Sequence, residues 1–179
     1  VARFHPQKDH ENLIKALFFL KKNNIKFLCV LVGYKLNHTN KYLIEIIKKY
    51  KMTNQIKLYG ESKKIKEIMS ELDIHVLPSA YGEGFPNVVA ESMACLTPSV
   101  VTDVGDSRFI VGKNGWVAKP RNSLHLSKKI NIALNELKKS TWKTKCKNAR
   151  TYIQINFSIK KMVYLYNQLW RKVLVKNNL

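Results

Sequence analysis

Short apolar runs alternate with segments of helical periodicity along most of the chain, and this alternation limits the folds available to it. The clearest run, Lys26–Gly33, is apolar on both faces and ends at a glycine, as a parallel strand covered on both sides does. We therefore expect an α/β fold, a Rossmann-like parallel sheet of about six strands with helices on both faces. The strands are expected at Val1–Phe4, Lys26–Gly33, Ile56–Tyr59, Asp73–Pro78, Ser99–Thr102 and Gly115–Ala118.

Helices are predicted between these strands from apolar residues spaced three or four apart. Asp9 or His10 is expected to cap the first, Ser62 to cap the third, and Pro86 to lie in the first turn of the fourth. From Ser123 onward the chain is predicted to be helical, so it divides into a sheet region, 1–122, and C-terminal helices, 123–179. The last helix carries an apolar stripe expected to be a packing face: Ile159, Met162, Val163, Tyr166, Leu169, Trp170 and Val173.

The composition indicates one globular domain. Of the 179 residues, 45% are hydrophobic, which is enough for a packed core and too many for intrinsic disorder. No run approaches the roughly 18 apolar residues of a membrane span. The three widely spaced cysteines indicate reduced, buried residues of a cytoplasmic protein instead of a disulfide or zinc framework. Because the first residue is Val1 and a strand starts there at once, we expect the chain to be excised from a longer protein.

The net charge of +20 raises the question of a polyanionic partner. Most of the basic residues are lysines that occur in pairs at polar positions of the predicted helices, where solvated faces are the simplest interpretation. Arginine, which binds phosphate with two parallel hydrogen bonds and recognises bases, is rare in the sequence. Attraction to an anionic membrane surface and binding to nucleic acid remain open as alternatives.

The segment from Pro78 to Ala94 has the strongest features of a ligand-binding site. It places a loop with two glycines, Gly82 and Gly84, between a strand and a helix that is expected to start at Pro86. Glycines let backbone N–H groups approach a ligand, and the first turn of a helix has free N–H groups at the positive end of its dipole. The sequence therefore predicts a site for phosphate or polar sugar hydroxyls at this point.

Two carboxylates, Glu83 and Glu91, flank this predicted anion site. Acids beside a phosphate site are explained if the ligand also has hydroxyls, because carboxylates accept hydrogen bonds from diols. A nucleotide diphospho-sugar supplies both phosphates and diols. The alternative is that Glu83 only compensates the helix dipole and Glu91 is a solvated helix residue.

The spacing of the two acids within EGFPNVVAESMA resembles the signature of retaining glycosyltransferase family 4, whose members have the GT-B fold. The resemblance extends over nearly the whole chain. VARFHPQK is similar to the opening of the family's donor domain, VLVG to its second strand and IKLYG to the segment near the nucleobase, while PSVVTDVG and GWVA resemble its closing strands. The resemblance implies that the chain is the C-terminal nucleotide-sugar-binding domain, without the N-terminal acceptor domain.

The resemblance also implies a role for each matching residue. Arg3 and Lys8 would hold the diphosphate and counter the charge of the leaving group, and Glu83 would hold sugar hydroxyls near the reacting carbon. These three are the catalytic candidates. Glu91 would accept the ribose hydroxyls, and backbone near Gly60 would frame the base, expected to be uracil. Sugar hydroxyls and phosphate would meet the backbone of Gly84, Phe85, Pro86, Asn87 and Val88.

Two residues depart from the family pattern. Leu96 stands where glycine is usual, so we expect that turn to be built differently, and Asp106 replaces a common second glycine. The sequence has no Asp-x-Asp pair to hold a metal diphosphate and no ligand spacing among its five histidines. We therefore expect neither a metal nor a cofactor.

The expected function is retaining transfer of a hexose or N-acetylhexosamine from a UDP-sugar. The acceptor would be a saccharide or a polyprenyl-diphosphate-linked sugar in O-antigen or capsular polysaccharide synthesis, with no nucleic-acid partner. We expect a peripheral location at the cytoplasmic face of the cell membrane, and an isolated chain that binds donor but turns over little. A GT-B sugar-nucleotide epimerase or phosphorylase, or a basic module that binds nucleic acid or membrane, remains an alternative.

Overall fold

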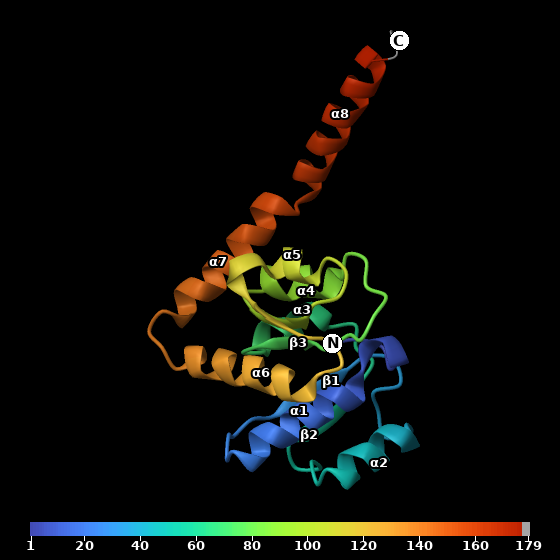
Figure 1. The fold of residues 1–179 in the computed structure, drawn as a ribbon, viewed down its shortest axis with the longest axis vertical. Helices are drawn as coiled ribbons and strands as arrows, with labels where there is room; N and C mark the ends of the chain where they lie inside the picture. Colours follow the sequence, from blue (N-terminus) through green and yellow to red (C-terminus); the bar gives the residue numbers. More distant parts are fainter. Residues whose placement is uncertain (177–179) are drawn as a thin grey trace.

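The computed structural model describes residues 1–176, and in it strands and helices alternate as the sequence predicts (Figure 1). The strands are β1 (Cys29–Val32), β2 (Ile56–Gly60), β3 (His75–Leu77), β4 (Ser99–Thr102) and β5 (Trp116–Ala118). The α-helices are α1 (His10–Lys22), α2 (Lys41–Lys49), α3 (Ile65–Glu71), α4 (Asn87–Ala94), α5 (Ser107–Val111), α6 (Ser123–Leu137), α7 (Trp142–Asn156) and α8 (Ile159–Lys176). Two short 3-10 helices are η1 (Pro6–Lys8) and η2 (Gly112–Asn114).

The strands form two parallel sheets, one of β1 and β2 and one in the order β3-β4-β5. Cys29 of β1 lies opposite Ile56 of β2, and Val100 of β4 lies opposite Val76 of β3 and Trp116 of β5. Because the strands within each sheet are parallel, their carboxyl ends open on the same edge, where α/β proteins bind ligands.

The expected strand Val1–Phe4 is wrong as a strand, although its backbone runs parallel to β1. Its N–H groups donate to the carbonyls of Val32 and Tyr34, at 2.9 and 2.8 Å. Among residues 1–176 the return bond of a parallel ladder, from the N–H of Tyr34 to the carbonyl of Ala2, is not made. The segment lies between β1 and β3 (Figure 1), so it joins two sheets in place of the expected continuous sheet of about six strands.

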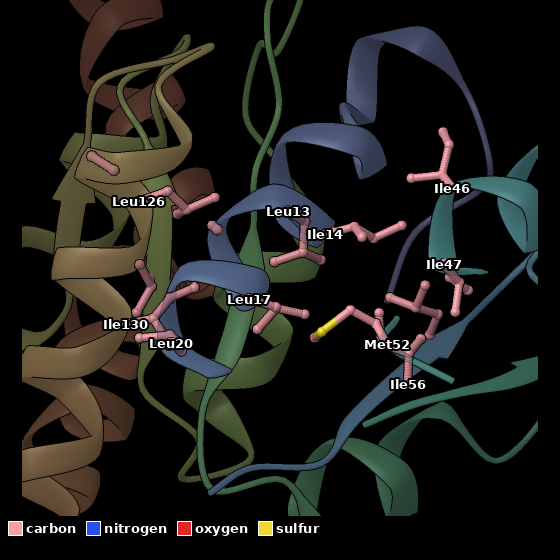
Figure 2. Close-up of a cluster of buried hydrophobic side chains, with 14 of the residues drawn as sticks. Leu13, Ile14, Leu17, Leu20, Ile46, Ile47, Met52, Ile56, Leu126 and Ile130 are labelled. Atoms are coloured by element: carbon pink, nitrogen blue, oxygen red, sulfur yellow. The ribbon is translucent and has the colours of Figure 1, made fainter. Parts of the chain in front are cut away.

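One face of the molecule is covered by α1 and α6, which pack side by side. Figure 2 shows apolar side chains of α1 between those of α6 and those of α2 and the start of β2. This cluster follows the helical spacing read from the sequence, since Leu13, Leu17 and Leu20 of α1 are all buried in it. Truncating a fully buried member such as Ile14, which is 0% exposed, would cost about 2–5 kcal/mol.

The opposite face is covered by α4, α5 and α7, which bury a second apolar cluster against the β3-β4-β5 sheet. All four residues of β4 are buried, with Val100 in the first cluster and its neighbour Val101 in the second. Successive side chains of a strand point to opposite faces, so β4 separates the two cores. The helices therefore cover both faces of the sheet, as expected.

The helix starts agree with the sequence at one of three predicted positions. Asp9 caps α1, because its side chain accepts a hydrogen bond from the N–H of Asn12 at 3.2 Å. Ser62 does not cap α3: its hydroxyl accepts from the N–H of Lys64, the actual N-cap, in a turn before the helix. Pro86 is the extended N-cap residue of α4 and not part of its first turn.

The turn after α4 keeps the geometry that glycine usually supplies, so the expectation that Leu96 requires a different turn is wrong. The N–H of Leu96 donates to the carbonyl of Met93 and that of Thr97 to Ser92, at 3.1 and 3.0 Å, which is the Schellman motif. Leu96 adopts a left-handed φ of 68°, and its side chain is 39% exposed. A Cβ in this conformation costs about 1–2 kcal/mol.

The last helix, α8, extends away from the domain, and no other element of residues 1–176 lies beside it (Figure 1). The predicted helix is confirmed, but its apolar stripe is not a packing face within this chain: Ile159 is 76% exposed and Trp170 59%. None of the helices in residues 1–176 combines the length and apolar character that crossing a membrane requires.

The three cysteines are free thiols in the structure, as expected. Each is partly exposed, so the prediction that they are buried is wrong. Cys29 lies at the start of β1, where it packs against the first apolar cluster, Cys95 lies at the end of α4 and Cys146 lies in α7.

Candidate functional site

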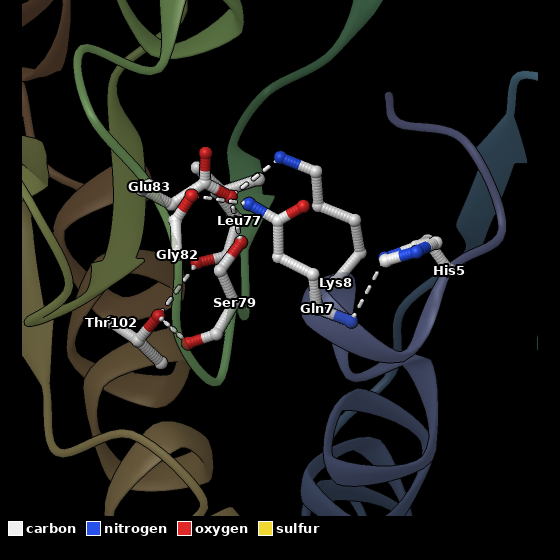
Figure 3. Close-up of polar contacts among 8 residues, drawn as sticks. All are labelled: His5, Gln7, Lys8, Leu77, Ser79, Gly82, Glu83 and Thr102. Carbon is white, nitrogen blue, oxygen red and sulfur yellow. Dashed lines mark hydrogen bonds and ion pairs between the residues drawn. The ribbon is translucent and has the colours of Figure 1, made fainter.

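Two loops meet at the carboxyl end of the β3-β4-β5 sheet (Figure 3). One consists of residues 5–9 and contains η1, and the other consists of residues 78–86 and joins β3 to α4. The N–H of Ala80 donates to the carbonyl of Gln7 at 2.8 Å, and the side-chain amide of Gln7 donates to the carbonyl of Gly82 at 2.7 Å. These bonds join the two loops into one unit.

Lys8 and Glu83 form an ion pair at the centre of this unit, with Nζ and Oε1 2.5 Å apart. Their side chains are only 14% and 7% exposed. The hydroxyl of Ser79 donates to the same Oε1 at 2.5 Å, and the hydroxyl of Thr102 in β4 donates to the carbonyl of Ser79 at 2.5 Å. Glu83 is thus fixed by neighbours from two loops and a strand, and no side chain among residues 1–176 binds its Oε2.

Gly105 supports the same loop through its backbone. It has a left-handed φ of 54°, and a Cβ at this position would lie 1.9 Å from the carbonyl oxygen of Glu83. The N–H of Asp106 donates to the carbonyl of Gly84 at 3.0 Å. Only glycine therefore allows this approach, and Asp106, which departs from the family pattern, contributes a backbone bond to the loop.

The start of α4 follows directly on this loop. Pro86 is buried at the N-cap, and the N–H of Val89 donates to its carbonyl at 2.9 Å. Within the described part of the chain the N–H groups of Asn87 and Val88 have no partner, as the first turn of a helix requires. The unpaired groups and the positive end of the dipole therefore lie where the sequence predicts an anion site.

Three predicted site residues lie outside the Lys8–Glu83 pair. Arg3 is exposed in the segment beside β1, Glu91 is exposed on the second turn of α4, and Gly60 ends β2 with a φ of 80°. None of the three makes a hydrogen bond or ion pair with Lys8 or Glu83 in residues 1–176. The structure joins two of the three catalytic candidates, Lys8 and Glu83, directly, and leaves the third, Arg3, exposed and without a bond to either in the described residues.

A cavity of about 360 Å³ lies beside the joined loops, between the starts of α1 and α6, and no predicted donor residue lines it. The guanidinium of Arg121 lies over the ring of Tyr81 at its wall, and Glu11 there pairs with Lys15 at 2.8 Å. Across residues 1–176 no three His, Cys, Asp or Glu side chains gather as a metal site requires. That the reaction needs no metal stays a prediction.

Sequence reasoning missed the residues that fix Glu83. Ser79 and Thr102 carry hydroxyls at the carboxyl ends of neighbouring parallel strands. Because these ends meet at one edge of the sheet, the strand pattern could have indicated that both residues lie near Glu83. Gln7 lies next to Lys8, and no sequence feature predicts that it contacts the loop of Glu83. Gly105 lies within the motif compared with the family, yet the sequence does not reveal that it contacts the loop of Glu83.

The fold and the joined loops define a Rossmann-like ligand-binding domain of an α/β, GT-B-like kind. Residues 1–150 match the family described as "Glycosyl transferases group 1", and the chain belongs to this family. This confirms the coarser part of the resemblance seen in the sequence.

Individual relatives agree with this assignment. The chain is 32% identical over 118 residues to the N,N'-diacetylbacillosaminyl-diphospho-undecaprenol alpha-1,3-N-acetylgalactosaminyltransferase of Campylobacter jejuni, covering 64% of this chain and 31% of that protein. A glycosyltransferase structure from Rickettsia africae aligns with a TM-score of 0.86 at 26% identity, over 97% of this chain and 46% of the other. Anabaena HepE in complex with UDP aligns with a TM-score of 0.78 at 26% identity, over 98% and 47%. The chain thus spans about a third or less of its curated relatives and just under half of these solved chains.

Proposed function

We propose that this chain is the donor-binding half of a retaining glycosyltransferase of family 4. It binds a UDP-hexose or UDP-N-acetylhexosamine, and the complete enzyme transfers the sugar to a saccharide or polyprenyl-diphosphate-linked acceptor in O-antigen or capsular polysaccharide synthesis. Membership in the glycosyl transferases group 1 family, the UDP named in the HepE structure and the lipid-linked acceptor in the name of the Campylobacter relative support this proposal.

The observation that carries the proposal is the junction of a buried acid, a cation and an open helix start. Lys8 lies on Glu83, and the unpaired N–H groups of Asn87 and Val88 follow a few residues later. A diphosphate placed between Lys8, Arg3 and these N–H groups would meet three sources of positive potential. The free Oε2 of Glu83 would accept a hydroxyl of the sugar, and Glu91 the ribose diol.

The chemistry that this arrangement supports is front-face displacement. The bond between the sugar's anomeric carbon and the phosphate oxygen breaks, the acceptor oxygen bonds to the same face of that carbon, and the acceptor's proton passes to the departing phosphate. Arg3, Lys8 and the helix start stabilise the charge on the leaving UDP. We assign the free Oε2 of Glu83 to a hydroxyl of the sugar and not to nucleophilic attack in a double displacement, while its Oε1 binds Lys8 and Ser79.

Calorimetric titration with UDP tests the proposal. We expect binding with a dissociation constant of about a millimolar or lower, which gives a binding free energy of at least about 4 kcal/mol. Arg3→Ala combined with Lys8→Ala should abolish this binding. The matched control is Arg171→Ala combined with Lys172→Ala, which removes the same charge from exposed positions of α8. Unchanged UDP affinity in the first double variant would refute the site assignment.

The expected absence of a metal requirement and the inactivity of the isolated chain belong to the same proposal. UDP affinity should be the same in magnesium and in EDTA, because Arg3, Lys8 and the helix start supply the positive charge themselves. The chain alone should transfer no measurable sugar, since it spans less than half of the solved glycosyltransferase chains that it matches. Metal-dependent affinity, or transfer by these residues alone, would contradict the respective expectation.

We also propose that the protein acts peripherally at the cytoplasmic face of the cell membrane. The support is the net charge of +20 and α8, an amphipathic helix whose first turn contains no acidic residue and whose described side chains are exposed. Sedimentation with vesicles containing about a third phosphatidylglycerol should be salt-sensitive and unaffected by UDP. Absence of binding to anionic vesicles at low salt would refute this location, and preferential binding to DNA would favour the nucleic-acid alternative.

A further inference from the structure

An aromatic cluster at the junction of α7 and α8 has no part in the proposed chemistry. Phe157 follows the last residue of α7, and its ring packs edge-on against Phe109 and Tyr152, with centroids 5.3 and 5.7 Å apart. The hydroxyl of Tyr152 also donates to the carbonyl of Phe109 at 3.0 Å. Phe157 is therefore fixed to both α7 and α5 at the point where the chain turns into α8.

The same ring touches the loop of residues 78–86, which joins β3 to α4. The centroids of Phe157 and Phe85 lie 5.4 Å apart, with the ring planes inclined by 57°. Phe85 is 41% exposed and stands between Gly84, whose carbonyl binds Asp106, and the N-cap Pro86. A shift of Phe85 therefore moves the backbone that leads into the open start of α4.

The contact between Phe157 and Phe85 links this loop to α8. In the described part of the chain, α8 has no neighbouring element and joins the domain through Phe157 and Ser158 (Figure 1). Ser158 starts the helix, since its hydroxyl and carbonyl accept bonds from the N–H groups of Lys161 and Met162. Any change in the direction of α8 requires the backbone to bend at Phe157 and Ser158. Phe157 also carries the ring that packs against Phe85.

We propose that Phe157 is a positioning residue for the donor site: it holds Phe85, and with it the start of α4, in the geometry that binds the diphosphate. The direction of α8 is thereby coupled to donor affinity. The expected effect of Phe157 on UDP affinity rests on the proposed function. In the described part of the chain the ring of Phe157 packs against the rings of Phe85, Phe109 and Tyr152, so its effect is on position and not on the reacting groups.

Hydrogen exchange of the ligand-free chain tests the coupling without reference to UDP. Phe157→Ala should speed the exchange of amides 84–88 by about tenfold while amides within α1 keep their rate. The matched control is Phe109→Ala, which removes a ring from the same cluster that does not contact Phe85. Equal effects of the two variants on amides 84–88 would overturn the inference. Should Phe157→Ala fail to give a cooperative unfolding transition, Phe157→Leu replaces it with the same expectation.

UDP titration of the same variants tests the consequence for binding. Phe157→Ala should weaken UDP binding about threefold to tenfold, Phe109→Ala should change it less than twofold, and Phe157→Tyr should restore it. If the unchanged chain binds no UDP, the proposed function is wrong. The hydrogen-exchange result still shows whether Phe157 holds the backbone of residues 84–88 in place. If it binds UDP and Phe157→Ala binds equally well, only the inference on Phe157 fails.

Discussion

Breaking the Lys8–Glu83 pair should destabilise the domain more than the loss of an ordinary surface ion pair. Surface pairs are worth about 0–1 kcal/mol, whereas removing one partner of a buried pair costs about 3–5 kcal/mol. The two side chains here are 14% and 7% exposed, close to buried, and Glu83 keeps the Ser79 hydrogen bond when Lys8 is removed. We therefore expect Lys8→Met and Glu83→Gln each to lower the free energy of unfolding by about 2–3 kcal/mol.

A double-mutant cycle measured by urea unfolding isolates the interaction. The Lys8→Met, Glu83→Gln double variant should be about 2 kcal/mol more stable than the sum of the single effects predicts. The control cycle uses Glu11 and Lys15 on α1, whose charged atoms are 2.8 Å apart but whose side chains are 36% and 40% exposed. Its coupling should stay below about 0.5 kcal/mol. A Lys8–Glu83 coupling no larger than that of the control would refute the reasoning.

Three further predictions concern stability. Leu96→Gly should raise Tm by about 2 °C, because glycine relieves the left-handed φ of 68° in the Schellman turn, whereas Leu96→Ala should not. Gly105→Ala should lower the free energy of unfolding, measured in urea, by at least about 3 kcal/mol, since its Cβ would lie 1.9 Å from the Glu83 carbonyl oxygen. A smaller loss would mean that the loop of Glu83 can shift at little cost. Burial lowers the pKa of His10 from 6.5 to about 4, so only the unfolded chain takes up this proton between those values. Stability should therefore fall by about 2 kcal/mol from pH 7 to pH 5, and His10→Gln should lose this part of the pH dependence.

Much of the fold follows from local sequence signals. Buried strands such as β1 and β4 and amphipathic helices such as α1 are found because each pattern repeats with the period of its structure. Val1–Phe4 fails as a strand for a non-local reason: it donates hydrogen bonds to Val32 and Tyr34, residues about 30 positions away, and receives no return bond from the N–H of Tyr34. The stripe on α8 predicts a packing face, but spacing alone does not say which surface covers it.

The site divides in the same way. The loop with Glu83 and the open start of α4 are predicted because their glycines and proline act locally. The bond from Lys8 to Glu83 joins residues 75 positions apart in the sequence, and only the resemblance to a family placed them in one site. Ser79 and Thr102 needed the strand ends to be placed first. Leu96 was judged from its residue type, yet the hydrogen bonds of the turn impose a left-handed φ despite the Cβ.

The structure of the chain with UDP bound, determined by crystallography, tests the central claim most directly. The account predicts that the diphosphate lies within hydrogen-bonding distance of the side chains of Arg3 and Lys8 and of the N–H groups of Asn87 and Val88. It also predicts that the ribose hydroxyls bind Glu91. UDP bound elsewhere, for example in the cavity between the starts of α1 and α6, with these groups still in contact with solvent, would contradict it.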